Sequence, residues 1–239
     1  MITPAPNPDH LSLVRDELDL LAELVPLAEQ RILELGCGNA RLARSLLERF
    51  AGSEVVGLEV DSVQHAKNLA APQERLLFLA ASAEAVPFPR RSFDGAMMLK
   101  SLHHVPIPAM DAALAEVARV LRSGGWFYVS EPIYGGALNE IVRLYNDEGV
   151  VRAAAQAAVD RALAAGKDWL PVEDRCFAQV VRFAGWADFA QRMLYPSFVE
   201  LQITPDIEAR VKAAFEALCG SDGVRFVRPM HARLLRRRP

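Results

Sequence analysis

The first half of the chain alternates between two hydrophobic periods. From Leu11 to Leu27, apolar side chains recur every three or four positions, which predicts an amphipathic helix. Short apolar runs bounded by turn residues then predict strands at residues 31–35, 53–60, 75–81, 93–99 and 126–132. The segments between them keep a helical period and predict helices at 41–50, 65–70 and 108–122. Strands and helices that alternate in this way predict a parallel sheet covered by helices on both faces.

The pattern changes after Pro132. Residues 137–166 are rich in alanine and predict a helical insertion or lid. A later strand is predicted at 192–200, followed by a helix at 207–220 and a final strand at 224–235. We therefore expect a single domain in which a regular α/β core is followed by a helical elaboration.

Composition and charge narrow the class of protein. The chain has 239 residues, of which 51% are hydrophobic and 24% charged, so it can fill a globular core and is not intrinsically disordered. The net charge of −3 lacks the positive surplus of a protein that binds nucleic acid through phosphates. No run approaches the roughly 20 apolar residues of a membrane span. Three widely spaced cysteines without a C-x-x-C pair fit a reducing cytoplasm, so we expect a soluble cytoplasmic protein.

Two features suggest a nucleoside-binding site. The segment Glu34-Leu35-Gly36-Cys37-Gly38-Asn39-Ala40 lies between a predicted strand and helix, where its glycines allow a sharp turn and close approach of a ligand. A dinucleotide fingerprint would need a small residue at position 41, which is Arg41. Glu59 ends the next strand, where a carboxylate can accept hydrogen bonds from both ribose hydroxyls of an adenosine. The alternative for Glu59 is an exposed carboxylate at a strand end.

The pattern E-x-G-x-G-x-A resembles motif I of the class I S-adenosylmethionine-dependent methyltransferases. Segments 80–94, 99–105 and 118–132 resemble further motifs of that family in the same order, so the resemblance covers residues 30–132. It is closest to the small-molecule branch similar to quinone-biosynthesis methyltransferases. The resemblance implies a doubly wound α/β fold with a seven-stranded, mostly parallel Rossmann-like sheet, an antiparallel last strand and a helical cap inserted after strand 5. The implied division is an N-terminal helix (1–29), a cofactor-binding core (30–132), a helical lid (133–190) and the last strands and helix (191–239).

The resemblance also implies a set of residues that bind S-adenosylmethionine. They are Glu34, Gly36, Cys37, Gly38, Glu59, Val60, Ser82, Ala83, Glu84 and Lys100. The chain departs from the family at Ala81-Ser82, where Gly-Asp usually offers a carboxylate to the adenine amino group. Ser82, the amide of Ala83 or Glu84 would have to replace it. Lys100 is a candidate partner for the cofactor's carboxylate or an acidic substrate, and the alternative is a solvated lysine.

Three residues are candidates for catalysis. His104 corresponds to a histidine that serves as a general base in some relatives, and its alternative role is to order the loop. Glu131 at the end of strand 5 is a second candidate base. Tyr134 directly follows that strand and could contact the sulfonium through a cation–π interaction. Because His103 and His104 are adjacent, we expect their side chains to diverge and to form no metal site.

The resemblance implies a reaction and a class of substrate. We expect methyl transfer to an O, N or C nucleophile of a small molecule, with S-adenosylhomocysteine as the product. Asn139 and Arg143, four apart on a predicted helix, could contact that substrate. Two alternatives remain, namely intramolecular cyclisation or cleavage of S-adenosylmethionine, which releases methylthioadenosine, and a non-catalytic module that binds the cofactor. The sequence indicates no nucleic-acid or membrane partner and leaves the oligomeric state open.

Overall fold

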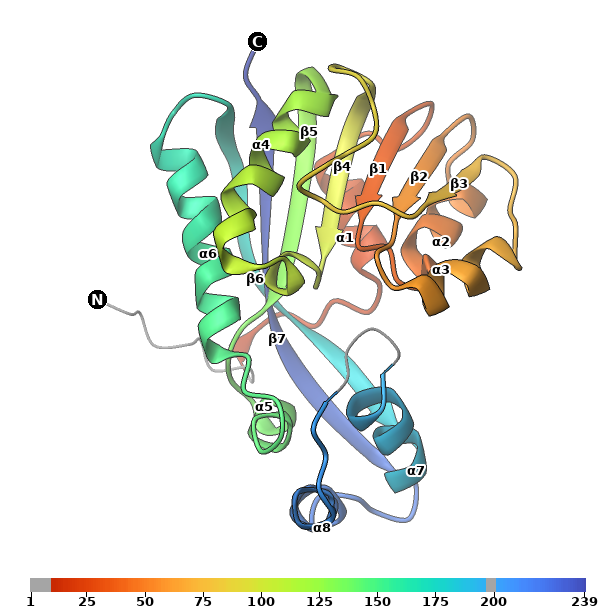
Figure 1. The fold of residues 1–239 in the computed structure, drawn as a ribbon, viewed down its shortest axis with the longest axis vertical. Coiled ribbons are helices and arrows are strands. Elements are labelled where there is room, and N and C mark those ends of the chain that lie inside the picture. Colours follow the sequence, from red (N-terminus) through yellow and green to blue (C-terminus); the bar gives the residue numbers. More distant parts are fainter. Residues whose placement is uncertain (1–9, 197–200) are drawn as a thin grey trace. The chain divides into compact units, whose positions relative to one another are not determined.

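A computed structural model describes residues 10–196 and 201–239 (Figure 1). The chain divides into two compact units, and we describe each by itself. The core unit contains Asp16–Glu131, Ala153–Arg175 and His231–Pro239. The insert unit contains Met1–Arg15, Pro132–Arg152 and Cys176–Met230.

A seven-stranded sheet has the order β3-β2-β1-β4-β5-β7-β6. The strands are β1 (Arg31–Leu35), β2 (Glu54–Leu58), β3 (Leu76–Leu79), β4 (Phe93–Leu99), β5 (Leu121–Pro132), β6 (Trp169–Phe183) and β7 (Val224–Arg237). The first five are parallel, and β1 lies between β2 and β4, with Ile32 opposite Val55 on one side and Gly95 on the other. The arrowhead of β7 lies at the edge of the sheet opposite those of β1 and β4 (Figure 1), so the sheet is mixed as predicted.

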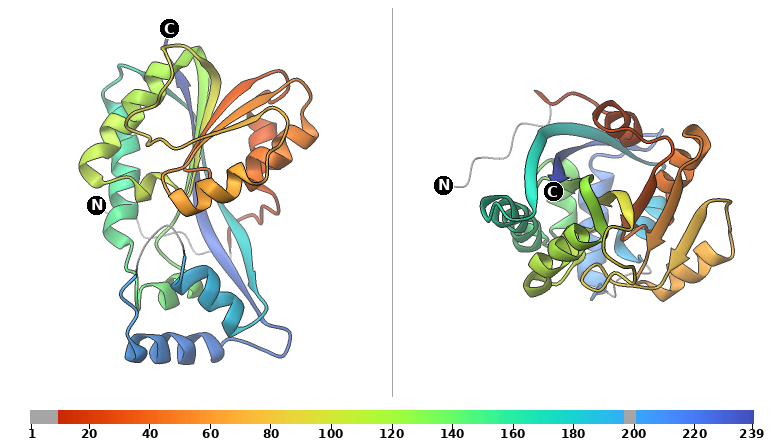
Figure 2. Two further views of the ribbon diagram at one scale, coloured as in Figure 1. Left: turned by 45° about the vertical axis from the view of Figure 1, so that its right-hand side comes forward. Right: turned by 90° about the horizontal axis from the view of Figure 1, so that it is seen from above.

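Helices of the core unit cover both faces of its sheet (Figure 2). The helices of the whole chain are α1 (Glu17–Leu24), α2 (Arg41–Arg49), α3 (Ser62–Leu69), α4 (Met110–Val120), α5 (Ala137–Val142), α6 (Gly149–Ala164), α7 (Trp186–Phe189) and α8 (Pro205–Glu216). Side chains of α4 and α6, such as Leu114 and Val159, pack with Leu33 and Val129 of the sheet in one buried cluster. Gly95 of β4 makes room for the neighbouring Trp126 of β5, because a Cβ at Gly95 would lie 2.0 Å from the indole ring.

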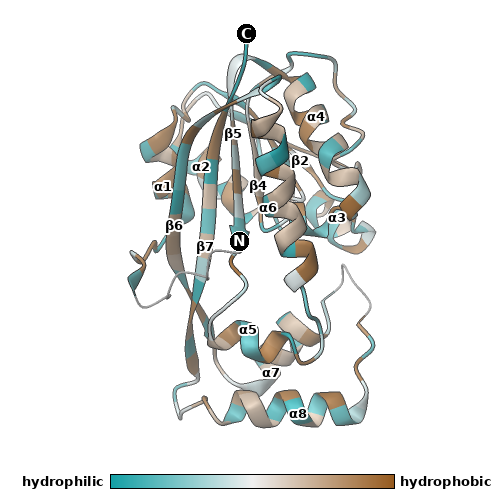
Figure 3. Ribbon diagram, turned by 90° about the vertical axis from the view of Figure 1, so that its left-hand side faces the viewer, coloured by the Kyte–Doolittle hydropathy of each residue, from teal (hydrophilic) through white to brown (hydrophobic). Residues whose placement is uncertain are grey.

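The insert unit has a hydrophobic core of its own. Phe183, Phe189 and Phe215 are almost completely buried, and their rings lie 4.7 to 6.1 Å apart. Figure 3 shows hydrophilic and hydrophobic bands along α8, as expected for a helix that buries one face. Val211 and Phe215 are the buried residues on that face.

The later part of the chain differs from the prediction in two places. The predicted strand at 192–200 is wrong for its described part, because residues 186–194 are helical, and residues 197–200 lie outside the described residues. The strand is instead β6, which lies at the edge of the sheet and exposes residues on both faces, so it has no continuous apolar run. The alanine-rich segment forms α5 and α6 with a break between them rather than one helix.

Candidate active site

The turn after β1 needs backbone conformations that favour glycine. Gly36, Gly38 and Ala40 have φ values of 67°, 53° and 54°. A Cβ at Gly36 would lie 2.7 Å from the Cβ of Ser101, so a larger residue does not fit. A Cβ at Gly38 would meet nothing within 4 Å, so this glycine leaves open space beside the loop. Ala40 immediately precedes α2 and has the left-handed conformation without the freedom of glycine.

Glu59 joins the glycine turn to the end of β2. Its Oε2 accepts a hydrogen bond from the amide of Gly38 at 2.7 Å, and its Oε1 accepts one from the amide of Asp61 at 2.9 Å. The side chain is 7% exposed. A carboxylate has about four lone-pair sites, so two remain for further donors. The neighbouring Val60 is 70% exposed and presents an apolar surface beside this carboxylate.

Asn68 on α3 supports the same turn, and our sequence analysis missed it. Its Nδ2 donates to the carbonyl of Gly38 at 2.7 Å, and its side chain is 3% exposed. The sequence offered no signal for it, because Asn68 is the one buried residue of α3 and no buried apolar face marks this helix. Cys37 is also buried here, and burial raises the pKa of its thiol well above the usual value, so it stays protonated.

Glu34, in β1, is a buried carboxyl group. The side chain is 4% exposed, and its Oε2 has no hydrogen-bond partner in the part of the chain that the structure describes. Desolvation by burial raises its pKa to about 8, and the nearby Lys100 opposes this effect. Glu34 is therefore largely protonated at neutral pH in this structure.

Lys100 follows β4 in a left-handed conformation, with a φ of 57°. Its Nζ lies 3.4 Å from Oε2 of Glu17, a residue of α1 that is 1% exposed. Tyr128 donates to the other oxygen of Glu17 at 3.1 Å. Lys100 is thus paired with a buried carboxylate. This pairing contradicts the alternative interpretation, in which Lys100 is a solvated lysine.

Glu131 is 2% exposed and positions the loop after β4. Its Oε1 accepts from the amide of Leu102 at 2.8 Å, and its Oε2 is hydrogen-bonded to Nδ1 of His103. His104 is exposed, whereas His103 is buried. The two imidazole rings lie only 4.0 Å apart on a 3₁₀ turn, so the prediction that they diverge is wrong. The alternation assumed for a regular backbone does not hold in this tight turn.

The turn after β3 carries Ser82, Ala83 and Glu84. All three are half-buried, and the turn is closed by a hydrogen bond from the amide of Ala85 to the carbonyl of Ser82 at 3.3 Å. Among the described residues, the side chains of Ser82 and Glu84 have no hydrogen-bond partner. Both are therefore available to a ligand.

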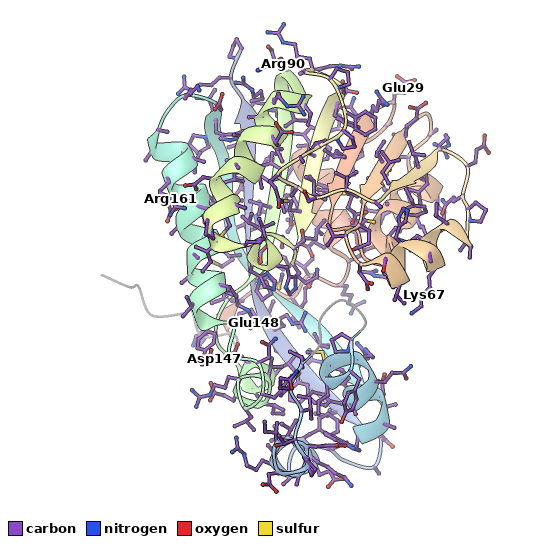
Figure 4. All side chains as sticks on the ribbon, in the orientation of Figure 1. Glu29, Lys67, Arg90, Asp147, Glu148 and Arg161 are labelled. Carbon is purple, nitrogen blue, oxygen red and sulfur yellow. The ribbon has the colours of Figure 1, made fainter. Side chains whose placement is uncertain are left out.

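Tyr134, Asn139 and Arg143 belong to the insert unit. Tyr134 is hydrogen-bonded to the carboxylate of Asp147, which lies between α5 and α6 (Figure 4). Asn139 is 7% exposed and its Oδ1 accepts a hydrogen bond at 3.0 Å, while the exposed Arg143 pairs with Glu140 at 2.9 Å. The structure does not bring Asn139 and Arg143 together at one polar site.

A cavity of about 190 Å³ lies at the opposite edge of the core unit's sheet, before β4 and β5. Arg90, labelled in Figure 4, lines it with Arg119 and Arg237. Arg119 donates to the carbonyls of Phe88 and Val86, at 2.7 and 2.9 Å, and also pairs with a glutamate. These bonds show that Arg119 holds the loop that contains Val86 and Phe88 in place. The cavity is separate from the residues predicted to bind the cofactor.

Comparison with known proteins finds similarity in the part of the chain that carries the glycine turn and Glu59. Residues 32–125 match the family model described as a methyltransferase domain. A fatty-acid O-methyltransferase from Mycolicibacterium smegmatis is 35% identical over 107 residues, which are 43% of this chain and 37% of that protein. A demethylmenaquinone methyltransferase from Thermus thermophilus is 35% identical over 136 residues, or 55% of this chain and 60% of that protein. The chain thus covers less than two thirds of these curated relatives.

Solved structures support the same fold. The YcgJ protein of Bacillus subtilis matches with a TM-score of 0.63 at 18% identity, covering 93% of this chain and 98% of that one. In the described residues, no helix has the length and apolar character needed to cross a membrane.

Proposed function

We propose that the chain methylates a small molecule with S-adenosylmethionine, because residues 32–125 match a methyltransferase domain and the sheet has the class I strand order. The observation that carries the proposal is the position of Glu59. Its buried carboxylate is fixed by the amides of Gly38 and Asp61, and it retains two lone-pair sites for the ribose hydroxyls. These two sites support the binding of the adenosine half of the cofactor at Glu59.

The other residues of the core unit also fit this cofactor. Val60 offers an exposed apolar side chain to the adenine ring, and Ser82 and Glu84 offer polar groups to its edge. The Oε2 of Glu34, which has no partner in the described part of the chain, can accept a hydrogen bond from the cofactor's ammonium group. The open space beside Gly38 lets the ligand approach the backbone. When bound, the cofactor would supply a methyl group activated by its positively charged sulfur.

The chain's own contribution is to orient the acceptor and exclude water, because the leaving group is already good. We keep His104 as the candidate base, which would raise the rate by about 10²–10⁴-fold if the acceptor must lose a proton. Glu131 acts on this loop through His103 and the Leu102 amide, so we assign it a positioning role. Tyr134, Asn139 and Arg143 remain candidates for contacts with the acceptor.

The named relatives act on small molecules, as their printed names for a fatty acid and demethylmenaquinone indicate, and this supports a small-molecule acceptor. The net charge of −3 supports the exclusion of nucleic acid as the substrate. Because the relatives are methyltransferases, intramolecular reaction of the cofactor and a non-catalytic role are not favoured. A cytoplasmic location stays a prediction from the cysteine pattern.

The test of this proposal is the substitution Glu59→Ala, with Glu54→Ala as its matched control. Glu54 lies at the other end of β2 and its side chain is 64% exposed. We expect the affinity for S-adenosylmethionine in calorimetry to fall at least tenfold in Glu59→Ala, which is about 1.4 kcal/mol, and to be unchanged in the control. Glu59→Gln keeps one acceptor oxygen for the loop and should also bind more weakly. Circular dichroism would show that both variants fold.

Product analysis separates the reactions. With a panel of small acceptors, formation of S-adenosylhomocysteine supports methyl transfer. Formation of methylthioadenosine would instead establish intramolecular chemistry. Unchanged cofactor affinity in Glu59→Ala would show that our placement of the ribose is wrong.

A further inference from the structure

The arginine-lined cavity of the core unit has no role in the proposed reaction. It has a volume of about 190 Å³ and lies where β4 and β5 begin, whereas the glycine turn follows the end of the parallel strand β1. Figure 4 shows Arg90 at this edge of the sheet. Four of the seven lining residues are arginines, namely Arg90, Arg91, Arg119 and Arg237. Guanidinium groups repel one another, so a cavity lined in this way favours an anion.

Two of these arginines are fixed by the chain itself. Arg119 is 23% exposed, and four of its five N–H groups already donate, two to Glu116 and two to carbonyls of the loop before β4. Arg237 is 22% exposed, donates to the carbonyl of Ala118 at 2.8 Å and pairs with Asp168 at 3.3 Å. Both guanidinium groups are therefore held in position without a ligand, which lowers the cost of ordering them when one binds.

The other two arginines are not paired. Arg90 and Arg91 are exposed, and within the described residues their side chains form no ion pair and donate no hydrogen bond. Arg91 has a φ of 60°, a left-handed conformation that is unfavourable for a residue with a Cβ. Its amide donates to the carbonyl of Arg119 at 3.1 Å, and the amide of Ser92 donates to the carbonyl of Val120 at 2.7 Å. The end of α4 thus holds the backbone that carries both unpaired guanidinium groups.

The charges at the cavity wall specify how much negative charge would balance it. The four lining arginines contribute four positive charges. Glu116 pairs with Arg119, and Asp168 pairs with Arg237, which leaves a net charge of +2. Glu116 also interacts electrostatically with Arg90, but its single negative charge is counted only once. Among the described residues, no other carboxylate forms an ion pair with a lining arginine.

Charged residues next to the wall do not cancel this surplus. Arg122 is paired with Asp94, so the two together add no net charge. Arg236 donates to the carbonyl of Gly124 at 3.1 Å, and Arg238 donates to that of Trp169 at 3.3 Å. Both are bonded to neutral carbonyls, so they add positive charge near the cavity. A ligand that balances the wall therefore carries two negative charges rather than one.

We propose that this cavity binds a dianionic phosphate group, either free or carried by a small monoester. A phosphate group has three terminal oxygens, and a guanidinium can donate to two of them in parallel. The arginines come from three separate segments, which suits a tetrahedral group better than a planar carboxylate. The exposed Ser123 adds a hydroxyl donor to the wall.

The size of the cavity limits what it can enclose. Pockets that enclose a whole drug-sized ligand have volumes of roughly 300–1,000 Å³. The smaller cavity would hold the phosphate group and leave the rest of a monoester outside. The proposal does not rest on the proposed function, because the cavity lies apart from the residues predicted to bind the cofactor.

The first experiment is calorimetric titration of the full chain at a pH of about 8 in a buffer without phosphate. The ligands are phenyl phosphate and inorganic phosphate, which carry about two negative charges at this pH, and methyl phenyl phosphate, a diester with one. We expect the two dianions to bind at least tenfold more tightly than the diester. Tighter binding of phenyl phosphate than of inorganic phosphate would support an organic monoester, and equal binding would support free phosphate.

The variants remove the unpaired arginines, whose exposed side chains can be replaced without loss of the fold. We expect Arg90→Met and Arg91→Met each to weaken binding of phenyl phosphate at least tenfold. Arg90→Lys should weaken it less than Arg90→Met, because lysine keeps the charge but not the paired donors.

The matched control is Arg225→Met. Arg225 is exposed, forms no ion pair within the described ranges and belongs to the insert unit, although it also lies on β7. This variant should bind phenyl phosphate as the natural chain does. Thermal denaturation checks folding and gives a second readout, because phenyl phosphate should raise the melting temperature of the natural chain and of Arg225→Met more than that of Arg90→Met.

Four results would overturn the proposal. Equal phenyl phosphate affinity in Arg90→Met, Arg91→Met and Arg225→Met would remove both arginines from the site. Equal binding of the diester would show that the second negative charge is not recognised. Displacement of phenyl phosphate by S-adenosylhomocysteine would place the anion at the cofactor site instead of the cavity. A single-stranded oligonucleotide that binds through these arginines at least tenfold more tightly than phenyl phosphate would identify a nucleic-acid surface instead of a site for a small ligand.

Discussion

The buried carboxyl group of Glu34 makes stability depend on pH in a way that can be measured. Its pKa is raised from the usual 4.5 to about 8, chiefly because burial disfavours the charged form. In the unfolded chain the group ionises above pH 4.5, while in the folded chain it keeps its proton until about pH 8. Unfolding between these two values therefore releases a proton, and the free energy of unfolding must fall as the pH rises.

The size of this fall in the free energy of unfolding follows from the interval between the two pKa values. The contribution of Glu34 falls by about 1.4 kcal/mol for each pH unit between 4.5 and 8. Over the whole window the loss approaches about 5 kcal/mol, which is an upper limit because the protein relaxes around a buried charge. Glu34→Gln cannot ionise and keeps a similar shape. The variant should therefore gain stability relative to the natural chain as the pH rises, and the difference should level off above pH 8.

The assay is urea denaturation of both proteins without cofactor, in steps from pH 5 to pH 9. Glu54→Gln is the control, because Glu54 is 64% exposed and should leave the pH dependence unchanged. A difference between Glu34→Gln and the natural chain that stays constant across this range would refute the reasoning. It would mean that Glu34 ionises in the folded protein near its ordinary pKa.

The glycine turn gives two further predictions. Gly36→Ala should lose a few kcal/mol of stability through its clash with Ser101, and Ser101→Gly should restore part of that loss. Gly38→Ala should lose only about 1–2 kcal/mol of stability but bind S-adenosylmethionine at least tenfold more weakly. Denaturation and calorimetry measure the two effects, and equal effects of the two variants would contradict the open space beside Gly38. Ala40→Gly should raise stability by about 0.5–1 kcal/mol, because it relieves a left-handed alanine, and a lower melting temperature would show that chain entropy outweighs that strain.

The fold of the core unit was predictable because its strands, helices and turns follow local sequence patterns. The strand at 93–99 coincides with β4, and the glycine turn and Glu59 follow their strands where parallel topology brings them to one edge. The later part of the chain was less predictable. Its edge strand β6 carries polar residues on both faces, so periodicity did not reveal it, and the strand was placed further along the chain.

The candidate site likewise has features that the sequence predicts and features that it does not. The sequence by itself determined which residue types stand at the strand ends, and so identified Glu34, Gly38 and Glu59, because these positions depend only on strand order and turn chemistry. The tertiary structure decided their partners. Asn68 reaches the Gly38 carbonyl from a separate helix, and Lys100 pairs with the buried Glu17 of α1. Burial and pairing are properties of the packed chain, so no local pattern can specify which charges are paired.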